Sequence, residues 1–371
     1  MSNVVGKVDR TQRRHSFLGF PLAVVYKFFD DQGNYLAATV TYYAFIAIFP
    51  LLLLASSIFG FVLQGNPDLQ EQALNSALGQ FPIIGDQLGR PEGLTGSTGA
   101  VVVGSLAALY GCLGLGQAIQ NVMATAWAVP RNSRPNPFLL RFKSLALLLF
   151  AGLGVLGLSV FGAVGSNAEM FGTELDTTIR WLILAATVLI VGLVLTFLFR
   201  LASARSLRLR RVAPGAFFVA VLWQALQHLG TIYATRVLTG TSSMNGVFGL
   251  VLGLIGLIYV GAVIAVLGVE VNVVIARRLW PRALLTPFTD SVDLTEADRR
   301  AYAMYAQMQR HKGFETVTVR FEGRDGGTHE IVLDPDAKDS KQARTTEIPA
   351  LLDPVVEQPG PQRSEGVGTQ S

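Results

Sequence analysis

Charged side chains are scarce in this chain. Only 15% of its 371 residues are Asp, Glu, Lys or Arg, while 50% are hydrophobic and the mean hydropathy is +0.42. Soluble domains carry about 25% charged residues. Since a soluble protein could not distribute this much apolar surface without aggregating, the composition excludes an ordinary soluble domain and predicts a polytopic membrane protein.

Cysteine is nearly absent, and histidine is rare. Cys112 is the single cysteine, so the chain has no disulfide framework. The four histidines lie far apart, without the short spacings that are typical of metal ligands: His15, His228, His311 and His329. The sequence also lacks a CxxC pair, a Walker loop and a nucleophile elbow. It therefore predicts no metal site, no cofactor and no catalytic residue.

The residues of a nuclease site are missing as well. Two-metal nucleases hold their ions with clustered carboxylates and histidines, and this sequence has no such cluster. Since it has no other catalytic constellation either, we expect the protein not to be an enzyme. The basic N-terminal residues lack interleaved aromatic side chains, so we expect no nucleic-acid partner. The net charge of +4 is explained by basic loops that orient a membrane protein.

Long apolar runs are abundant. Each is long enough for an α-helix, which rises about 1.5 Å per residue, to cross a hydrocarbon core of about 30 Å. The predicted spans lie at about 36–63, 99–122, 145–165, 179–199, 212–235 and 246–274. They predict an all-α fold, a polytopic membrane bundle of six transmembrane helices within residues 36–278.

Basic residues are concentrated in alternate loops. The N-terminal arm, the loops at 122–144 and 200–211, and the segment after residue 277 are rich in Lys and Arg, whereas the loop at 166–178 has neither. Because basic loops tend to remain in the cytoplasm, this pattern predicts that both termini are cytoplasmic.

The segments that flank the bundle are more polar. Residues 1–35 are expected to form a mobile cytoplasmic arm followed by an interfacial helix, because the apolar stretch at 17–29 is too short to span a membrane. A cytoplasmic tail is expected over 284–371. It contains a predicted helix, with Thr295 and Asp298 as a capping pair, and a predicted two-stranded hairpin; after about residue 335 the composition predicts disorder.

Three stretches carry a resemblance to a known family. They are DDQGNYLAATVTYYAFIAIFPLLLL at 30–54, RVAPGAFFVAVLWQ at 211–224 and SSMNGVFGLVLGLIGLIYVGAVIAVLGVEVN at 242–272. In their order and spacing they resemble the YihY/BrkB family of bacterial inner-membrane proteins, over roughly residues 15–280. The resemblance implies six spans and a plasma-membrane location. Members of the family have been called virulence or serum-resistance factors, and the family once carried a ribonuclease name, but the resemblance implies no established activity.

Glu270 is a carboxyl group near the end of the last predicted span. An ionisable side chain in a span is costly and is a functional hypothesis, although Glu270 could also extend to the inner surface or pair with a loop arginine. Depth predicts polar neighbours at the same side of the membrane: Asp30, Asp31, Asn34, Gln117, Gln120, Asn121 and Asn272. Together these residues form either a network that locks the helices or a cytoplasm-facing cavity on a proton or substrate path.

His228 lies nearer the middle of the fifth predicted span. Gln224 lies one turn before it on the same face, so the two either relay protons, bind a polar head group or have a purely structural role. A run of arginines follows the fourth span: Arg200, Arg205, Arg208, Arg210 and Arg211. These arginines either fix the orientation of the chain or contact anionic lipid.

Convergent polar residues and glycine-rich helices favour a transporter or flippase of a small or lipid-like anionic substrate. The alternative is a non-transporting membrane scaffold whose cytoplasmic tail recruits partners. The expected partners are the lipid bilayer and anionic lipid. Small residues on one side of the last span suit either packing within the bundle or a homo-oligomer: Gly249, Gly253, Gly261 and Ala265.

Overall fold

The computed structural model describes residues 3–62, 98–167, 177–204, 207–237, 243–290, 292–322, 328–333 and 344–348. The chain divides into two compact units, a helical unit, Met1–Glu315, and a second unit, Thr316–Ser371.

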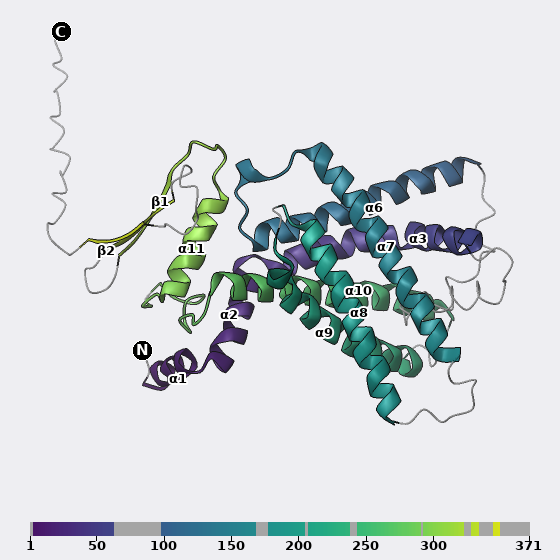
Figure 1. Cartoon of the computed structure of the whole chain (residues 1–371), viewed down its shortest axis with the longest axis horizontal. Coiled ribbons are helices and arrows are strands. Elements are labelled where there is room, and N and C mark those ends of the chain that lie inside the picture. The colour runs from purple at the N-terminus through teal and green to yellow at the C-terminus, as the bar shows by residue number, and fades with distance from the viewer. Residues whose placement is uncertain are drawn as a thin grey trace, which may run out of the picture. The chain divides into compact units, whose positions relative to one another are not determined.

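The first unit is built from helices (Figure 1). Two shorter helices, α1 (Asn3–Arg14) and α2 (Ser16–Asp30), precede the first long one. The long helices are α3 (Gly33–Val62), α6 (Thr98–Ala126), α7 (Pro137–Asn167), α8 (Thr177–Ala202), α9 (Leu209–Val237) and α10 (Ser243–Arg277). A 3-10 turn, η2 (Arg131–Ser133), lies between α6 and α7, and α11 (Glu296–Met308) follows α10.

Long helices occupy the positions of the predicted spans. Within the described ranges, four segments are long and apolar enough to cross a membrane: Pro137–Val155, Trp181–Ala202, Leu209–Gly230 and Val251–Arg277. They belong to α7, α8, α9 and α10. Large apolar side chains on these helices point outward, among them Leu149, Trp181 and Leu193. An apolar surface of this extent suits contact with lipid.

The six long helices contact one another in a closed order. Each packs against the next along the chain, α3 on α6, α6 on α7, α7 on α8, α8 on α9 and α9 on α10, and α10 returns to α3. The two shorter N-terminal helices join this closure, because α2 packs on α10 and α1 packs on α2. Residues from the two ends of the bundle therefore become neighbours (Figure 1).

Two glycines allow α9 and α10 to approach closely. A Cβ atom on Gly215 would lie 1.8 Å from the Gly268 carbonyl oxygen, and one on Gly268 would lie 2.2 Å from Val219 Cγ2. At the same crossing, the Asn272 side chain accepts a hydrogen bond from the Gly215 N–H at 2.7 Å and donates one to the Val212 carbonyl at 2.9 Å. Since close backbone approach favours helix association in lipid, these residues fix α9 on α10.

The N-terminal arm is a docked helix, in place of the mobile arm that the sequence predicts. Asp9 Oδ1 of α1 accepts a hydrogen bond from the Leu284 N–H at 2.9 Å. Gln12 Nε2 donates to the Arg282 carbonyl oxygen at 2.6 Å. These bonds hold α1 on the segment that follows α10. The prediction differs because it considered the basic charge of the arm and not its polar contacts with a distant segment.

The segment after α10 turns back onto the bundle. At the start of α11 the predicted capping pair is confirmed: the Asp298 N–H donates to Thr295 Oγ1 at 3.1 Å, and the Thr295 N–H donates to Asp298 Oδ2 at 3.0 Å. The side chains of Ala297 and Ala301 are buried. Although the composition changes near residue 284, α11 therefore belongs to the helical unit.

The second unit contains an antiparallel sheet in the order β1-β2-β3. β1 (Val317–Glu322) pairs with β2 (Thr328–Leu333), with Val319 opposite Ile331, and β2 pairs with β3 (Arg344–Ile348). β3 lies in the stretch whose composition predicts disorder. Its Thr345, Thr346 and Ile348 are β-branched and favour an extended chain, a local signal that the overall composition hides.

Candidate functional site

A cluster of buried charged side chains lies where α2 packs on α10. The Lys27 ammonium pairs with Asp31, one turn later in the chain, and lies 3.5 Å from Glu270 Oε2 of α10. All three side chains are fully buried. Lys27 Nζ also lies 5.1 Å from the centre of the Tyr305 ring of α11. Glu270 therefore pairs with a lysine of α2, whereas the sequence suggested a loop arginine or the inner surface.

A second group of ion pairs surrounds Arg282, which follows α10. Its Nη1 lies 2.7 Å from Asp30 Oδ2, and its Nε lies 2.6 Å from Asp298 Oδ1. The guanidinium carbon lies 5.8 Å and 5.5 Å from the ring centres of Tyr26 and Tyr302. Burial opposes the charged form, but Asp30 and Asp298 outweigh it and raise the pKa of Arg282 above its ordinary value. Arg282 thus remains charged and ties α2 to α11.

Carboxyl groups outnumber cations in this charge cluster, which comprises Lys27, Asp30, Asp31, Glu270, Arg282 and Asp298. Asp298 accepts hydrogen bonds from the Ala283 and Thr295 N–H groups, each at 3.0 Å, and the Asp30 side chain is 18% exposed. Asp31 and Glu270, in contrast, share Lys27. Within the part of the chain that the structure describes, neither oxygen of Glu270 accepts a hydrogen bond. One excess negative charge is therefore shared by Asp30 and Asp298, which have hydrogen bonds or solvent to stabilise it, and the other lies at Asp31 and Glu270.

Tyr305 of α11 packs against the charge cluster, with its ring beside Lys27. Burial, and then the negative charges of Asp31, Asp30 and Glu270, raise the pKa of Tyr305 well above its ordinary value. Its phenol is therefore neutral at physiological pH. A neutral hydroxyl can donate a hydrogen bond to a carboxylate, but it cannot supply positive charge.

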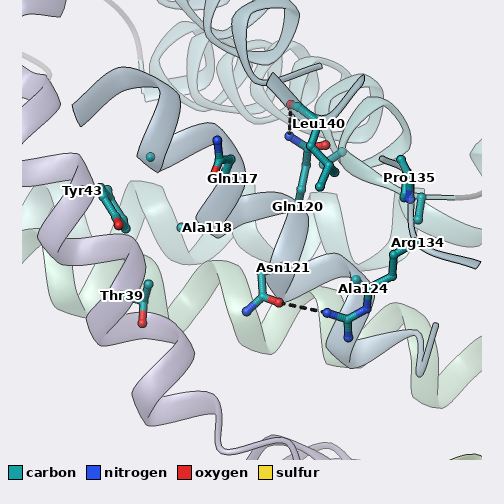
Figure 2. Close-up of a pocket in the computed structure, with 13 residues that line it drawn as sticks. Thr39, Tyr43, Gln117, Ala118, Gln120, Asn121, Ala124, Arg134, Pro135 and Leu140 are labelled. Atoms are coloured by element: carbon teal, nitrogen blue, oxygen red, sulfur yellow. Dashed lines mark hydrogen bonds between the residues drawn. The ribbon is translucent and has the colours of Figure 1, made fainter. Parts of the chain in front are cut away.

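A separate pocket of about 320 Å³ lies between α3, α6, the start of α7 and the end of α8 (Figure 2). Its volume falls within the range of small-ligand sites, about 300–1,000 Å³. The polar residues that line it are Thr39, Tyr43, Gln117, Gln120, Asn121 and Arg134. No carboxylate is among the described residues of its lining.

Arg134 is the charged residue of this polar pocket. Its Nη1 donates to Asn121 Oδ1 at 3.5 Å (Figure 2). Its Nε donates to the Val129 carbonyl oxygen, also at 3.5 Å. Burial, followed by repulsion from Arg131, lowers the pKa of Arg134 below its ordinary value. In the described ranges no carboxylate forms an ion pair with Arg134. An anion in the pocket would therefore compensate its charge.

Gln120 connects helices at the edge of the pocket. Its Nε2 donates to the Gly116 and Leu140 carbonyl oxygens at 3.1 and 3.0 Å and lies 3.0 Å from Ser144 Oγ. Figure 2 shows the bond to Leu140. Gln120 therefore ties α6 to α7, and Gln117 and Asn121 are the α6 amides that remain exposed on the pocket side.

The polar residues that the sequence grouped with Glu270 lie in different parts of the structure. Asp30, Asp31 and Glu270 belong to the charge cluster because Lys27 and Arg282 hold them there. Gln117, Gln120 and Asn121 line the polar pocket, so the structure does not combine them with Glu270 in a single cavity. Asn272 locks α9 to α10, and Asn34 is exposed at the start of α3.

The other predicted residues lie on helix surfaces. Gln224 is half-buried and His228 is exposed on α9, and neither lines the polar pocket. The arginines that flank the α8–α9 connection are exposed: Arg200, Arg208, Arg210 and Arg211. Arg205 lies outside the described residues. Among those that are described, no group of three or more His, Cys, Asp or Glu side chains could hold a metal ion.

Sequence reasoning missed the basic partners. Lys27 carried a signal, since it is the one charged residue in the apolar stretch at 17–29. Arg134 and Arg282 carried none, because basic residues beside a span are expected from orientation alone. Tyr305 and Asp298 were assigned to a separate tail and so were not considered as partners of the bundle.

The long apolar helices and the cluster packed at their ends define an integral membrane protein. The chain belongs to the BrkB family, because the family described as "Virulence factor BrkB" matches residues 24–288, which confirms the YihY/BrkB resemblance. The match includes Lys27, Glu270 and Arg282 and ends before α11.

Two relatives are similar to this chain. The putative ribonuclease-like protein YfkH of Bacillus subtilis (strain 168) is 24% identical over 262 residues, which cover 67% of this chain and 91% of that protein. An uncharacterized protein of Dickeya dadantii (strain 3937) is 39% identical over 49 residues, which cover 13% of this chain and 15% of that one. No solved structure matches the chain.

Proposed function

We propose that this protein moves a small anionic substrate, or a lipid with an anionic head group, across the membrane. The observation that carries the proposal is Arg134, a partly buried cation without a carboxylate partner among the described residues, in a pocket between long helices. The guanidinium and the exposed amides of Gln117 and Asn121 are hydrogen-bond donors that suit an oxyanion, and the Tyr43 side chain lines the same pocket.

The proposal includes six membrane crossings, with both termini in the cytoplasm. α3 and α6 would supply the two crossings beyond the four segments identified above, since each has about 30 residues. The basic residues at the ends of α8 and α10 support this orientation. The polar pocket then lies toward the cytoplasmic end of the bundle. By analogy with YihY/BrkB proteins, the membrane is the plasma membrane.

Reconstitution of the full chain into liposomes tests the proposal. One arm follows the movement of a fluorescent phosphatidylglycerol between leaflets, and the other follows the efflux of trapped inorganic phosphate. We expect the protein to accelerate one of the two. Arg134→Gln should lower that rate about tenfold or more, because a hydrogen bond to a charged group contributes about 1.5–3 kcal/mol.

Arg131→Gln is the matched control, since Arg131 is exposed and does not line the pocket. It should leave the rate unchanged. Rates equal to those of empty liposomes in both arms would sink the proposal. An equal loss in the two arginine variants would show that general surface charge, and not the pocket, matters.

The second compact unit favours a second candidate, a membrane scaffold. Thr316–Ser371 contains its own sheet and is separate from the helical unit, as a partner-binding module would be. Deletion of residues 316–371 separates the two functions. A cell that loses the phenotype of the full-length protein while transport and membrane abundance stay unchanged would support the scaffold. A cell that keeps this phenotype would argue against it.

A further inference from the structure

We propose that Asp31 and Glu270 share one bound proton, so that the contact between α2 and α10 contains a proton-binding site distinct from the polar pocket. The proposal does not depend on anion transport, because it rests on the charge cluster alone. Its ligand is a single proton taken from solvent.

The geometry places two carboxyl groups around one ammonium group. Lys27 pairs with Asp31, and its Nζ lies 3.5 Å from Glu270 Oε2. The two carboxyl side chains are fully buried, so water does not screen them. Two carboxylates that share a small dry site do not both ionise readily, because each negative charge opposes the other.

Buried carboxyl oxygens without hydrogen-bond partners are a second indication of a bound proton. Within the described residues, both oxygens of Glu270 and Asp31 Oδ1 are buried without a hydrogen-bond partner. Glu270 is directed toward the same ammonium that holds Asp31. A bound proton would convert one carboxylate into a hydrogen-bond donor and would remove the excess charge at the same time.

The neighbouring groups do not supply the missing charge. Arg282 is engaged by Asp30 and Asp298, and the Tyr305 phenol is neutral. Among the described residues, Lys27 is the cation that forms ion pairs with Asp31 and Glu270. Two carboxyls beside an ammonium are also too few ligands for a metal ion, in agreement with the absence of any suitable ligand group in the described ranges.

The position of the site gives the proton a structural effect. Asp31 lies at the end of α2, two residues before α3 begins, and Glu270 lies on α10; α3 and α10 are the two helices that close the ring. Loss of the proton would leave one uncompensated negative charge at this closure. The contact between the two ends of the bundle is therefore sensitive to proton binding.

Infrared spectroscopy of the full chain in lipid nanodiscs at neutral pH tests the proposal. A protonated carboxyl group absorbs apart from carboxylates, and its band shifts in D₂O. We expect such a band in the unaltered protein. Glu270→Gln and Asp31→Asn should each remove the same band, since the remaining carboxylate then pairs one-to-one with Lys27. Lys27→Met should increase its area about twofold, because both carboxyls then lack a cation.

Glu296→Gln is the matched control, because the Glu296 side chain is 86% exposed, and it should leave the band unchanged. Each variant is compared only if it elutes as a single species from size-exclusion chromatography. Where Asp31→Asn fails this check, Glu270→Gln alone decides. Absence of the band from the unaltered protein, or its persistence in Glu270→Gln, would overturn the proposal.

Discussion

At the scale of single residues, Arg282 connects three helices, α1, α2 and α11. Its guanidinium holds carboxylates of α2 and α11 and lies between Tyr26 and Tyr302. Its carbonyl oxygen accepts a hydrogen bond from Gln12 of α1. A buried ion pair contributes little net stability relative to a well-packed apolar pair, but removal of one partner leaves the other charge buried without compensation.

Arg282→Met should therefore lower the free energy of unfolding by about 3–5 kcal/mol, because it leaves Asp298 fully buried and unpaired. Glu296→Gln is the control: the Glu296 side chain is 86% exposed and forms a surface pair with Arg300, so its loss should cost about 0–1 kcal/mol. Thermal unfolding in detergent measures both. Equal shifts in Tm for the two variants would contradict the assigned role of Arg282.

Asp9 gives the docking of α1 a pH dependence. Burial opposes its charged form, but hydrogen bonds from the Leu284 N–H, Gln12 and Arg13 outweigh burial and lower the pKa of Asp9. A lowered pKa contributes stability above the ordinary carboxyl pKa of about 4, and that stability is lost as the pH falls through the lowered value. Limited proteolysis should cut α1 faster below about pH 4 than at neutral pH. Asp9→Asn should be cut faster at neutral pH as well; cleavage independent of pH and of the variant would refute the role of Asp9.

Glu270 and its partners show what a sequence reveals at this scale. A carboxyl in a long apolar run is conspicuous, so Glu270 could be selected from local pattern alone. Its pairing with Lys27 depends on contact between α2 and α10, which are far apart in the chain and which no local pattern connects. The same limit explains why amides of α6 were assigned to Glu270 when they line a different site.

At the scale of elements, α9 and α10 approach closely enough for their backbones to meet. The two backbones touch at Gly215 and Gly268, where any Cβ atom would overlap its neighbour. The sequence identified a small-residue face on the last span that includes Gly261, but not Gly268. An α-helix has 3.6 residues per turn, so Gly268 lies almost two full turns after Gly261. It therefore lies on the same face of α10 as Gly261.

Gly215→Ala should disrupt this crossing, because its Cβ would lie 1.8 Å from the Gly268 carbonyl oxygen. Overpacking typically costs about 1–3 kcal/mol, and a clash with backbone cannot be relieved by a side-chain rotation. Gly256→Ala is the control, since a Cβ there meets no atom within 4 Å. The yield of monodisperse protein and its Tm should fall for Gly215→Ala alone. A similar yield from both variants would show that the helices separate at little cost.

At the scale of the whole molecule, the helix positions could be predicted and the unit boundary could not. Length and apolar content are local properties, so the predicted spans coincide with long helices. The boundary depends on where α11 packs, and a capping box with a mildly apolar helix does not reveal its docking site. The structure assigns α11 to the helical unit and begins the second unit at Thr316.

Two truncations test this boundary. Deletion of residues 316–371 should leave the Tm of the remaining protein nearly unchanged, because it removes only the second compact unit. Deletion of residues 284–371 also removes Asp298 and Tyr305, and it leaves Arg282 with Asp30 as its one remaining partner among the charge cluster. The longer deletion should therefore lower membrane abundance and Tm. The opposite order of stability would place the boundary near residue 284.

The closure of α10 on α3 also bears on how the protein is made. Chains fold from the N-terminus as they leave the ribosome, so Lys27 and α3 are synthesised well before Glu270. Until translation reaches α10, the flank of α3 that α10 later covers stays open to lipid or to an insertion chaperone. A nascent chain that stops short of α10 therefore displays an unfinished bundle edge, and this edge distinguishes incomplete from complete products for the quality-control machinery of the membrane.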